Sequence, residues 1–339
     1  MIVETIALIL AAGEGARMLS DTPKLLHKVC GTPMLEYVLR ALGPIAGERA
    51  IVVGHGRERI EEAFHGQATF IYQDRENGWG TGHAVLCARD VLKGKRGQVI
   101  VTAGDKPLVL PETYARLADE VRRGNACAML TDIVQNPMGY GRVIRENGRI
   151  CAVLRQNQLT GNQFMIQEVA ASVYCFDIEA LLSALEQLPC MDGEYHLTDV
   201  VSIMHEAGLL ISSVPALEKS ECLGVNDRVQ LAQAEKAMRL RINNRHMRGG
   251  VTLIDPENTY IQPGVTIAPD TVIHPGCMLE GHTTIDAGCV LYASRILNAH
   301  IGAGARVESS VVVDAYVEPG RKIGPFASIN PAGRPIGRA

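Results

Sequence analysis

The residues best suited to chemistry near the start of the chain are two glycines and two basic side chains. The apolar run Leu8–Ala12 leads directly into Gly13 and Gly15, and Arg17 and Lys24 follow. Glycine lets the backbone approach a phosphate closely and present N–H groups to it, and the basic side chains supply the charge that two or three phosphates require. The segment therefore predicts a polyphosphate site.

Two common nucleotide-binding motifs do not fit this segment. A dinucleotide-binding turn needs a third glycine where Met18 stands, and no acidic residue closes a following strand at the right place. The chain contains no G-x-x-x-x-G-K-[ST] sequence, which excludes a P-loop. The glycine loop is therefore either an ordinary turn or a phosphate site of another class, and the spacing of Arg17 and Lys24 favours the phosphate site.

A carboxylate stands at the end of a second apolar run. Asp105 comes shortly after Val99–Thr102, which we expect to be a buried strand. In open α/β sheets, ligands bind at the carboxyl ends of the strands, so Asp105 is a candidate for the same site as the glycine loop. The alternative is that Asp105 caps a helix ahead of Pro107.

The composition limits the partners and the compartment. A chain of 339 residues predicts two domains, and the net charge of -4 gives no general attraction to nucleic acid. Nine cysteines are scattered without a CxxC pair, which is typical of reduced cytoplasmic thiols. The run Ile6–Ala12 is too short to span a bilayer, and the start Met1–Glu4 lacks the basic flank of a signal peptide. We expect a cytoplasmic protein with no membrane partner.

Residues 1–225 alternate β-rich apolar runs with amphipathic stretches, which predicts an α/β domain with a Rossmann-like, mostly parallel sheet. The expected strands are Thr5–Leu10, Ala50–Val53, Thr69–Tyr72, Val99–Thr102 and Ala128–Thr131. The expected helices are Met34–Leu42, Arg57–Phe64, His83–Leu92, Pro111–Arg123, Ile178–Leu185 and Val200–Ala207.

The stretch 226–250 predicts a connecting helix, because good helix formers run to about Arg248 before Gly249-Gly250. From 251 to 339 aliphatic residues recur every six positions, with turn residues such as Pro263-Gly264 in the same phase. This repeat is typical of a left-handed parallel β-helix rather than a β-sandwich, and we expect its sides to pack into a homotrimer. The expected interior positions are Ile261, Ile267, Ile273, Leu279, Ile285, Leu291 and Leu297, then after a slip of four residues Ile301, Val307 and Val313, then Val317, Ile323 and Ile329.

Ordered motifs give the chain a specific resemblance. Residues 8–27 resemble the start of the sugar-phosphate nucleotidyltransferases, in particular the uridyltransferase domain of the bifunctional N-acetylglucosamine-1-phosphate uridyltransferase/glucosamine-1-phosphate acetyltransferase family. Further motifs follow in family order at Gln73 with Gly80–Val85, Gly104-Asp105, Asn136–Arg142, Glu194–Asp199 and Gly224–Asn226, and the hexapeptide segment comes after them.

The resemblance implies a role for each matching position. It places the nucleoside triphosphate against Leu10, Ala11, Ala12, Gly13, Gly15, Gln73, Gly80, Thr81 and Gly104, with Arg17 and Lys24 as catalytic cations. It assigns Mg²⁺ to Asp105 and Asn226, hard oxygen donors that suit this ion. It places the phosphorylated acceptor near Gly141, Arg155 and Glu168.

The implied reaction needs no general base, because a sugar 1-phosphate is already an anionic nucleophile at pH 7. Mg²⁺ with Arg17 and Lys24 would hold the phosphates and stabilise charge on the leaving pyrophosphate. We interpret His27 and His83 as packing or hydrogen-bonding residues.

The differences from the family pattern lie mainly at positions where the family binds the sugar. Arg155 stands where the family has a sugar-binding glutamate, and Ala170 where it has an asparagine. We therefore expect an acceptor other than N-acetylglucosamine 1-phosphate, since unpaired polar groups cost about 1–3 kcal/mol each. Arg155 either meets an extra carboxylate, phosphonate or phosphate on the acceptor or points to solvent. Ala103 and Lys106 also differ from the family, and two extra residues separate Gln73 from Gly80.

Some alternatives stay open. The bifunctional enzymes continue through further coils beyond the position of Ala339, so we expect no acetyltransferase activity. The nucleotide could be UTP, CTP or dTTP, with uridylyl transfer preferred. A catalytically silent scaffold protein is the rival hypothesis, and an acyltransferase using the hexapeptide coils is a weaker one.

Overall fold

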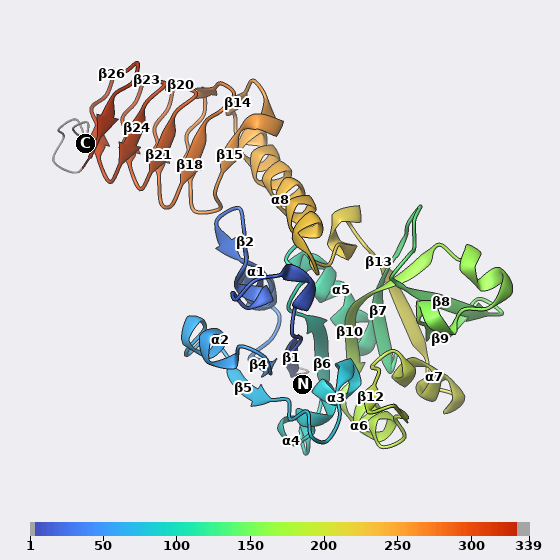
Figure 1. Ribbon diagram of the computed structural model, residues 1–339. Coiled ribbons are helices and arrows are strands. Elements are labelled where there is room, and N and C mark those ends of the chain that lie inside the picture. The colour runs from blue at the N-terminus through green and yellow to red at the C-terminus, as the bar shows by residue number, and fades with distance from the viewer. Residues whose placement is uncertain (1–3, 331–339) are drawn as a thin grey trace. The chain divides into compact units, whose positions relative to one another are not determined.

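The computed structural model of the protein describes residues 4–330 (Figure 1). The expectations for Met1–Val3 and for residues 331–339 of the hexapeptide segment lie outside this range. The chain divides into two units: residues up to His27 together with Pro33–Gln230, and Lys28–Thr32 together with the chain from Leu231 onward.

The first unit is built around one mixed nine-stranded sheet. Strands β4, β1 and β6 run parallel, with β5 beside β4, and the other edge contains the parallel pair β7 and β13. The long strand β10 joins the two parts antiparallel to its neighbours β6 and β7. The order is β13 (Ile211–Pro215), β7 (Cys127–Ile133), β10 (Glu168–Asp177), β6 (Gln98–Ala103), β1 (Thr5–Ala11), β4 (Glu48–Val53) and β5 (Thr69–Tyr72), with β8 (Gly141–Glu146) and β9 (Arg149–Leu154) attached through β10.

Helices cover both faces of the sheet because the central strands are apolar on both sides. In β1, Ile6 and Leu8 pack into one core while Ala7 and Ile9 pack into the other. Such continuous apolar runs are typical of strands buried on both faces. The helices are α1 (Met34–Leu42), α2 (Arg57–Ala63), α3 (Gly80–Cys87), α4 (Arg89–Leu92), α5 (Pro111–Arg122), α6 (Ile178–Leu185) and α7 (Asp199–Glu206).

The order of the strands creates a crevice beside β1. From β1 the chain continues to β4 and β5 on one side, and β6 then lies on the other side of β1. The connections therefore leave β1 in opposite directions, and such a switch point is where open α/β sheets bind ligands. The glycine loop follows β1 and Asp105 follows β6, so the topology brings the two together.

The α/β prediction and its five strands are confirmed, but the prediction was incomplete beyond residue 131. The hairpin of β8 and β9 and the strands β10 and β13 were not anticipated. The helix expected over His83–Leu92 begins earlier, at Gly80, and is interrupted at Ala88 between α3 and α4.

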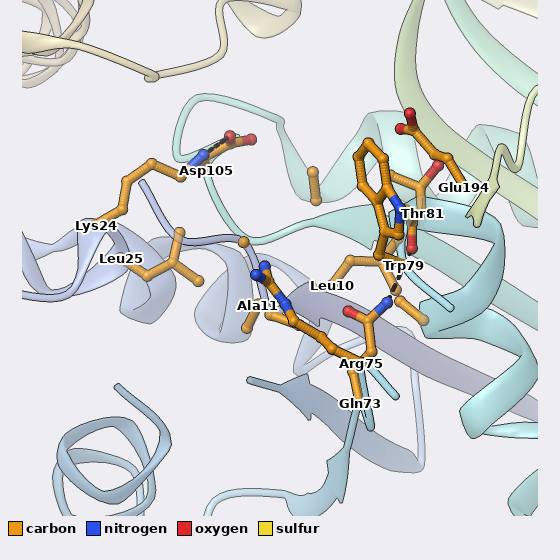
Figure 2. A pocket seen from close by; sticks show the side chains of 15 residues that line it. Leu10, Ala11, Lys24, Leu25, Gln73, Arg75, Trp79, Thr81, Asp105 and Glu194 are labelled. Atoms are coloured by element: carbon orange, nitrogen blue, oxygen red, sulfur yellow. Dashed lines mark hydrogen bonds and ion pairs between the residues drawn. The ribbon is translucent and has the colours of Figure 1, made fainter. Parts of the chain in front are cut away.

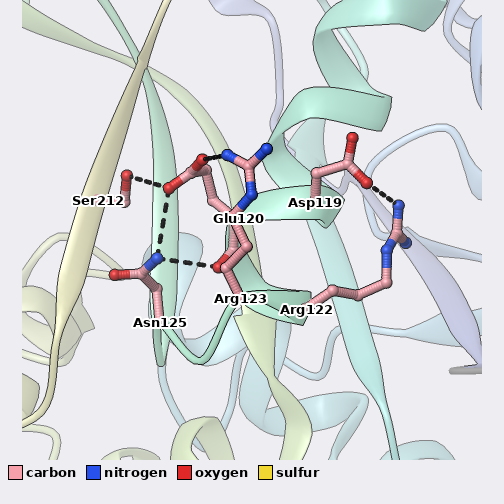
Figure 3. A network of polar contacts seen from close by, with 6 residues as sticks. All are labelled: Asp119, Glu120, Arg122, Arg123, Asn125 and Ser212. Atoms are coloured by element: carbon pink, nitrogen blue, oxygen red, sulfur yellow. Dashed lines mark hydrogen bonds and ion pairs between the residues drawn. The ribbon is translucent and has the colours of Figure 1, made fainter.

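A polar network ties the end of α5 to the edge strand β13 (Figure 3). The Glu120 carboxylate accepts hydrogen bonds from Ser212 Oγ at 2.8 Å and from Asn125 Nδ2 at 3.3 Å, and it pairs with Arg123 at 2.5 Å. Asp119 pairs with Arg122 on the same helix. Exposed ion pairs of this kind each contribute about 0–1 kcal/mol, so the network orients the edge strand more than it stabilises the core.

The second unit contains the helix α8 (Arg228–Arg248) from Leu231 onward and a parallel β-helix. Its short strands stack in three parallel sheets, which confirms the predicted left-handed β-helix class. The sheets are β14 (Thr252–Leu253), β17 (Val272–Ile273), β20 (Val290–Tyr292), β23 (Arg306–Glu308) and β26 (Lys322–Ile323); β15 (Tyr260–Ile261), β18 (Met278–Glu280), β21 (Arg295–Leu297), β24 (Val311–Val313) and β27 (Ser328–Ile329); and β16 (Thr266–Ile267), β19 (Thr284–Ile285), β22 (His300–Ile301) and β25 (Tyr316–Val317). Outside the β-helix, small hairpins occur at β2 (Lys28–Val29) with β3 (Thr32–Pro33) and, in the first unit, at β11 (Cys190–Met191) with β12 (Glu194–Tyr195).

The register of the β-helix interior was wrong at two positions. Ile296 and Val312 are buried, whereas the expected Leu297 and Val313 are only half-buried. Tight corners explain the difference, because non-glycine residues there adopt left-handed conformations, with φ of 37° at Ala293. Each such corner uses one residue fewer, so the spacing between successive interior residues falls from six to five there. The expected spacing of four residues between Leu297 and Ile301 does not occur.

Among residues 4–330, no helix combines the length and apolar character needed to cross a bilayer.

A pair of identical substitutions tests the corrected register. Val312→Ala should lower the free energy of unfolding of the β-helix by about 2 kcal/mol, because it removes buried aliphatic groups. Val313→Ala is the matched control and should cost less than about 0.5 kcal/mol. Calorimetry with far-UV circular dichroism measures both, and equal losses would contradict the register.

Candidate active site

A cavity of about 270 Å³ opens at the carboxyl ends of β1 and β6 (Figure 2). It lies in the crevice beside β1, where the sheet order changes direction. Its lining residues are Leu10, Ala11, Ala12, Gly13, Lys24, Leu25, Gln73, Arg75, Trp79, Gly80, Thr81, Ala84, Ala103, Asp105 and Glu194.

The loop after β1 depends on glycine at position 15. Gly15 has a left-handed φ of 66°, and a Cβ built there would lie 2.7 Å from the Cβ of Lys24. Only glycine allows Lys24 to pack across the loop in this way. Gly13 lines the cavity, whereas Arg17 lies in the short helix Ala16–Met18, exposed and outside the lining.

Lys24 lies between the two predicted metal ligands. Its Nζ is 2.5 Å from Asp105 Oδ2 and 3.3 Å from Asn226 Oδ1. The Lys24 and Asp105 side chains are 14% and 13% exposed, so the ion pair is shielded without being sealed from solvent. Residues from three distant parts of the chain thus converge on one cationic group.

Gly104 holds the strand ends close enough for this arrangement. Its N–H donates to the Leu10 carbonyl at 2.9 Å, and a Cβ at this position would lie 2.7 Å from Leu25 Cδ1. Gly104 therefore helps to position the strand ends that form the cavity, although it is not one of the lining residues.

The side-chain oxygens of Asp105 and Asn226 fit a magnesium ion. Asp105 Oδ2 and Asn226 Oδ1 already converge on one cation, the Lys24 ammonium. Mg²⁺ is commonly held by one or two protein oxygens together with waters and substrate phosphates. Residues 4–330 contain no group of three or more His, Cys, Asp or Glu side chains that could form a complete protein cage. Asp105 and Asn226 would therefore hold the ion only together with a phosphate ligand.

Gln73 is buried at the end of β5, with its side-chain donors used inside the protein. Its Nε2 donates to the Gly80 carbonyl at 3.1 Å and lies 3.2 Å from His83 Nδ1. The amide oxygen remains as the group that can accept a hydrogen bond from a ligand in the cavity.

Burial lowers the pKa of His83, the neighbour of Gln73. The imidazole is therefore neutral at pH 7. In this network Gln73 donates to Nδ1, which assigns the ring proton to Nε2. His83 thus fixes the orientation of the Gln73 amide.

The residues expected at the acceptor do not line the cavity. Arg155 Nη1 pairs with Asp199 Oδ1 at 2.6 Å and donates to Thr198 Oγ1 at 3.1 Å. Glu168 forms a bidentate pair with Arg145 at 2.7 and 2.8 Å. Gly141 begins β8, where a Cβ would lie 2.8 Å from Val153 Cγ1. Arg155 thus pairs with a carboxylate of the protein itself. The sequence had suggested only a contact with the acceptor or exposure to solvent.

The two unusual residues beside Asp105 take different positions. Ala103 lines the cavity. Lys106 is buried, its Nζ donates to the Cys222 carbonyl at 2.8 Å, and burial lowers its pKa. Lys106 therefore holds the loop after β6 to the segment that carries Asn226.

Several lining residues were missed from the sequence, notably Arg75, Trp79 and Glu194. Two of them lie in the stretch where this chain has two extra residues between Gln73 and Gly80. That length difference was the one available signal. Glu194 belongs to one of the ordered motifs, but the motif alone does not indicate a role for it.

All nine cysteines lie within the described residues, and all are free thiols.

Comparison with known proteins supports the resemblance seen in the sequence. Residues 7–197 match the MobA-like NTP transferase domain. Bifunctional protein GlmU of Clostridium novyi is 43% identical over 331 residues, spanning 96% of this chain and 72% of that protein. GlmU of Clostridium perfringens is 42% identical over 330 residues with the same coverage.

A solved structure shares the fold of the first unit. A putative glucose-1-phosphate thymidylyltransferase from Bacillus anthracis, in complex with a sucrose, superposes with a TM-score of 0.57 at 18% identity. The match covers 68% of this chain and 94% of that one.

The state of His83 gives a testable pH dependence. An NMR titration should find the pKa of His83 below 6.5, with His83→Asn used to assign its signal. Because the folded pKa is depressed, the unfolded chain binds more protons below about pH 6.5. Folding stability should therefore fall as the pH drops through this range, and fall less in His83→Asn. A pKa at or above 6.5 would contradict the assigned network.

Proposed function

We propose that this chain, which belongs to the MobA-like NTP transferase family and is a sugar-1-phosphate nucleotidyltransferase, transfers a uridylyl group from UTP in a Mg²⁺-dependent reaction that releases pyrophosphate. We further propose that its acceptor is a phosphorylated compound other than N-acetylglucosamine 1-phosphate.

The observation that carries the proposal is the placement of Lys24 between Asp105 and Asn226, beside the glycine loop. A cation and two hard oxygen donors at a cavity lined by Gly13 suit a metal–triphosphate complex. When bound, Mg²⁺ would neutralise phosphate charge and orient the phosphates for in-line attack.

The protein's own groups supply the remaining parts of this mechanism. Backbone N–H groups near Gly13 hold phosphate oxygens, and the Lys24 ammonium stabilises the negative charge that builds on the leaving pyrophosphate. Arg17 lies on the turn that follows the loop and adds a second cation from solvent. The acceptor phosphate is the nucleophile, so no side chain has to remove a proton.

The hydrogen bonds of Gln73 favour uracil or thymine as the base. Its amide nitrogen is used by Gly80 and His83, which leaves the oxygen as an acceptor. Uracil and thymine present an N3–H donor to such an oxygen, whereas cytosine has an acceptor at N3 and could donate only from its N4 amino group. The pairing favours UTP or dTTP over CTP.

Two side chains disfavour N-acetylglucosamine 1-phosphate as the acceptor. Arg155 has the opposite charge to the family residue, and Ala170 lacks the family's hydrogen-bonding group. The Arg155–Asp199 pair, with side chains 18% and 16% exposed, stands at the position of a family sugar-binding carboxylate. Ala170 is buried in β10 and offers no side-chain hydrogen bond to an N-acetyl group. Both features disfavour an N-acetylated sugar.

We also propose that the protein acts in the cytoplasm as a trimer formed through the β-helix. The free thiols fit a reducing compartment. The flat sides of a β-helix offer repeated surfaces for closed cyclic assembly. Light scattering coupled to gel filtration measures the oligomeric state.

Loss of either charged partner should remove turnover. In a pyrophosphate-release assay with UTP and the best acceptor of a sugar and phosphonate panel, Lys24→Ala and Asp105→Ala should each lower kcat/KM by about 10²–10³-fold. Lys236→Ala and Asp119→Ala remove exposed charges outside the cavity and serve as controls. Unchanged turnover in the first two variants would refute the proposed site. A folded wild-type protein with no turnover for any pair would favour the scaffold hypothesis.

The acceptor prediction uses the same assay. With N-acetylglucosamine 1-phosphate, kcat/KM should be at least about 30-fold below that of the best acceptor, since two missing partners cost about 1–3 kcal/mol each. Equal use of N-acetylglucosamine 1-phosphate would show that Arg155 and Ala170 do not control the choice.

A further inference from the structure

Trp79, the only tryptophan of the chain, is half-exposed at the wall of the cavity. It is 47% exposed, although an indole gains more than most side chains from burial. It lies in the segment Asp74–Trp79 between β5 and α3, where the chain has its two extra residues. A large aromatic face is thus presented to a cavity in which a ligand can cover it.

The backbone of Trp79 is fixed by the β11–β12 hairpin. The Trp79 N–H donates to the Gly193 carbonyl at 2.9 Å, and the Tyr195 N–H donates to the Trp79 carbonyl at 2.8 Å. Gly193 has φ of +83°, and a Cβ there would lie 3.2 Å from the indole Nε1. One edge of the indole therefore packs closely against the hairpin turn.

The other end of the segment is held as well. Asp74 accepts hydrogen bonds from the Glu76 N–H at 2.9 Å and from Asn77 Nδ2 at 2.6 Å, which forms a local turn. Arg75 pairs with Glu14 of the glycine loop. The protein's own contacts thus hold the segment that carries the indole, which lowers the entropic cost of a ligand contact with it.

The two ends of the cavity differ in chemistry. Figure 2 shows Lys24 and Asp105 at one end and Trp79, Thr81 and Glu194 at the other, with Gln73 below Trp79 in this view. A nucleotide whose phosphates lie at Lys24 would extend its base toward Trp79 and Gln73. Gln73 offers a hydrogen-bond acceptor to the base edge, and Trp79 offers a flat face.

We propose that Trp79 stacks on the nucleobase and is a determinant of nucleotide affinity that the extra residues between Gln73 and Gly80 bring into this site. The proposal rests on the proposed function, because it needs a nucleotide in the cavity. Stacking against an aromatic ring tolerates any base, so Trp79 supplies affinity while Gln73 supplies discrimination between bases.

The test compares UTP with ribose 5-triphosphate, which lacks a base. Calorimetry should show that Trp79→Ala weakens UTP binding about 5- to 150-fold and changes ribose 5-triphosphate binding by less than about twofold. Trp79→Phe keeps an aromatic face and should retain most of the affinity. Phe164→Ala removes another half-exposed aromatic ring, outside the cavity, and should have no effect. In the wild type, UTP should quench the fluorescence of the single tryptophan, whereas ribose 5-triphosphate should not.

The possible negative results distinguish a failure of the stacking proposal from a failure of the proposed function. If wild type binds UTP and Trp79→Ala binds it equally well, the stacking role is refuted and the proposed function is not. Equal weakening of UTP and ribose 5-triphosphate, or a change confined to the KM of the acceptor, also refutes stacking on the base. Wild-type protein that binds neither UTP nor another nucleoside triphosphate refutes the proposed function itself. Retained binding of ribose 5-triphosphate shows that Trp79→Ala is folded.

Discussion

The ion pair between Lys24 and Asp105 is the interaction on which the site depends. The Lys24 ammonium lies 2.5 Å from Asp105 Oδ2 and 3.3 Å from Asn226 Oδ1. Each group thereby satisfies the charge of the other in a partly shielded place, where either alone would be costly. In the proposed function, a metal–triphosphate complex would replace both partnerships at once, because the lysine would gain a phosphate and the carboxylate a cation.

The backbone makes this pairing possible through close approaches that only glycine permits. Gly15 lets Lys24 cross the loop after β1, and Gly104 lets β6 end beside Leu10. The sheet order then places both loops at the same crevice. These features are local, and they could be predicted from the sequence because a buried strand followed by small residues has few other interpretations. Asp105 was placed correctly by the same argument, since it follows a fully apolar strand.

The features that could not be predicted depend on contacts between distant residues. Strand β10 is antiparallel in a mostly parallel sheet, and nothing in its apolar run distinguishes the two directions. Arg155 finds Asp199 across 44 residues, so the sequence suggested only solvent or substrate as its partner. In the β-helix, the interior residue moves from Leu297 to Ile296 because a non-glycine corner tightens, which the hexapeptide spacing does not reveal. Trp79 lines the cavity only because a hairpin more than 100 residues later fixes its backbone.

We propose that Asp105 opposes triphosphate binding in the absence of metal and supports it when Mg²⁺ is present. The direct measurement is the affinity of wild type and Asp105→Ala for UTP, each with excess Mg²⁺ and with the metal chelated. Without Mg²⁺, Asp105→Ala should bind UTP at least as tightly as wild type, because Lys24 is released and one negative charge is gone. With Mg²⁺, wild type should bind more tightly, and Asp105→Ala should lose that gain. If Asp105→Ala weakens UTP binding equally in both conditions, the carboxylate does not act through a metal and the proposed metal site is contradicted.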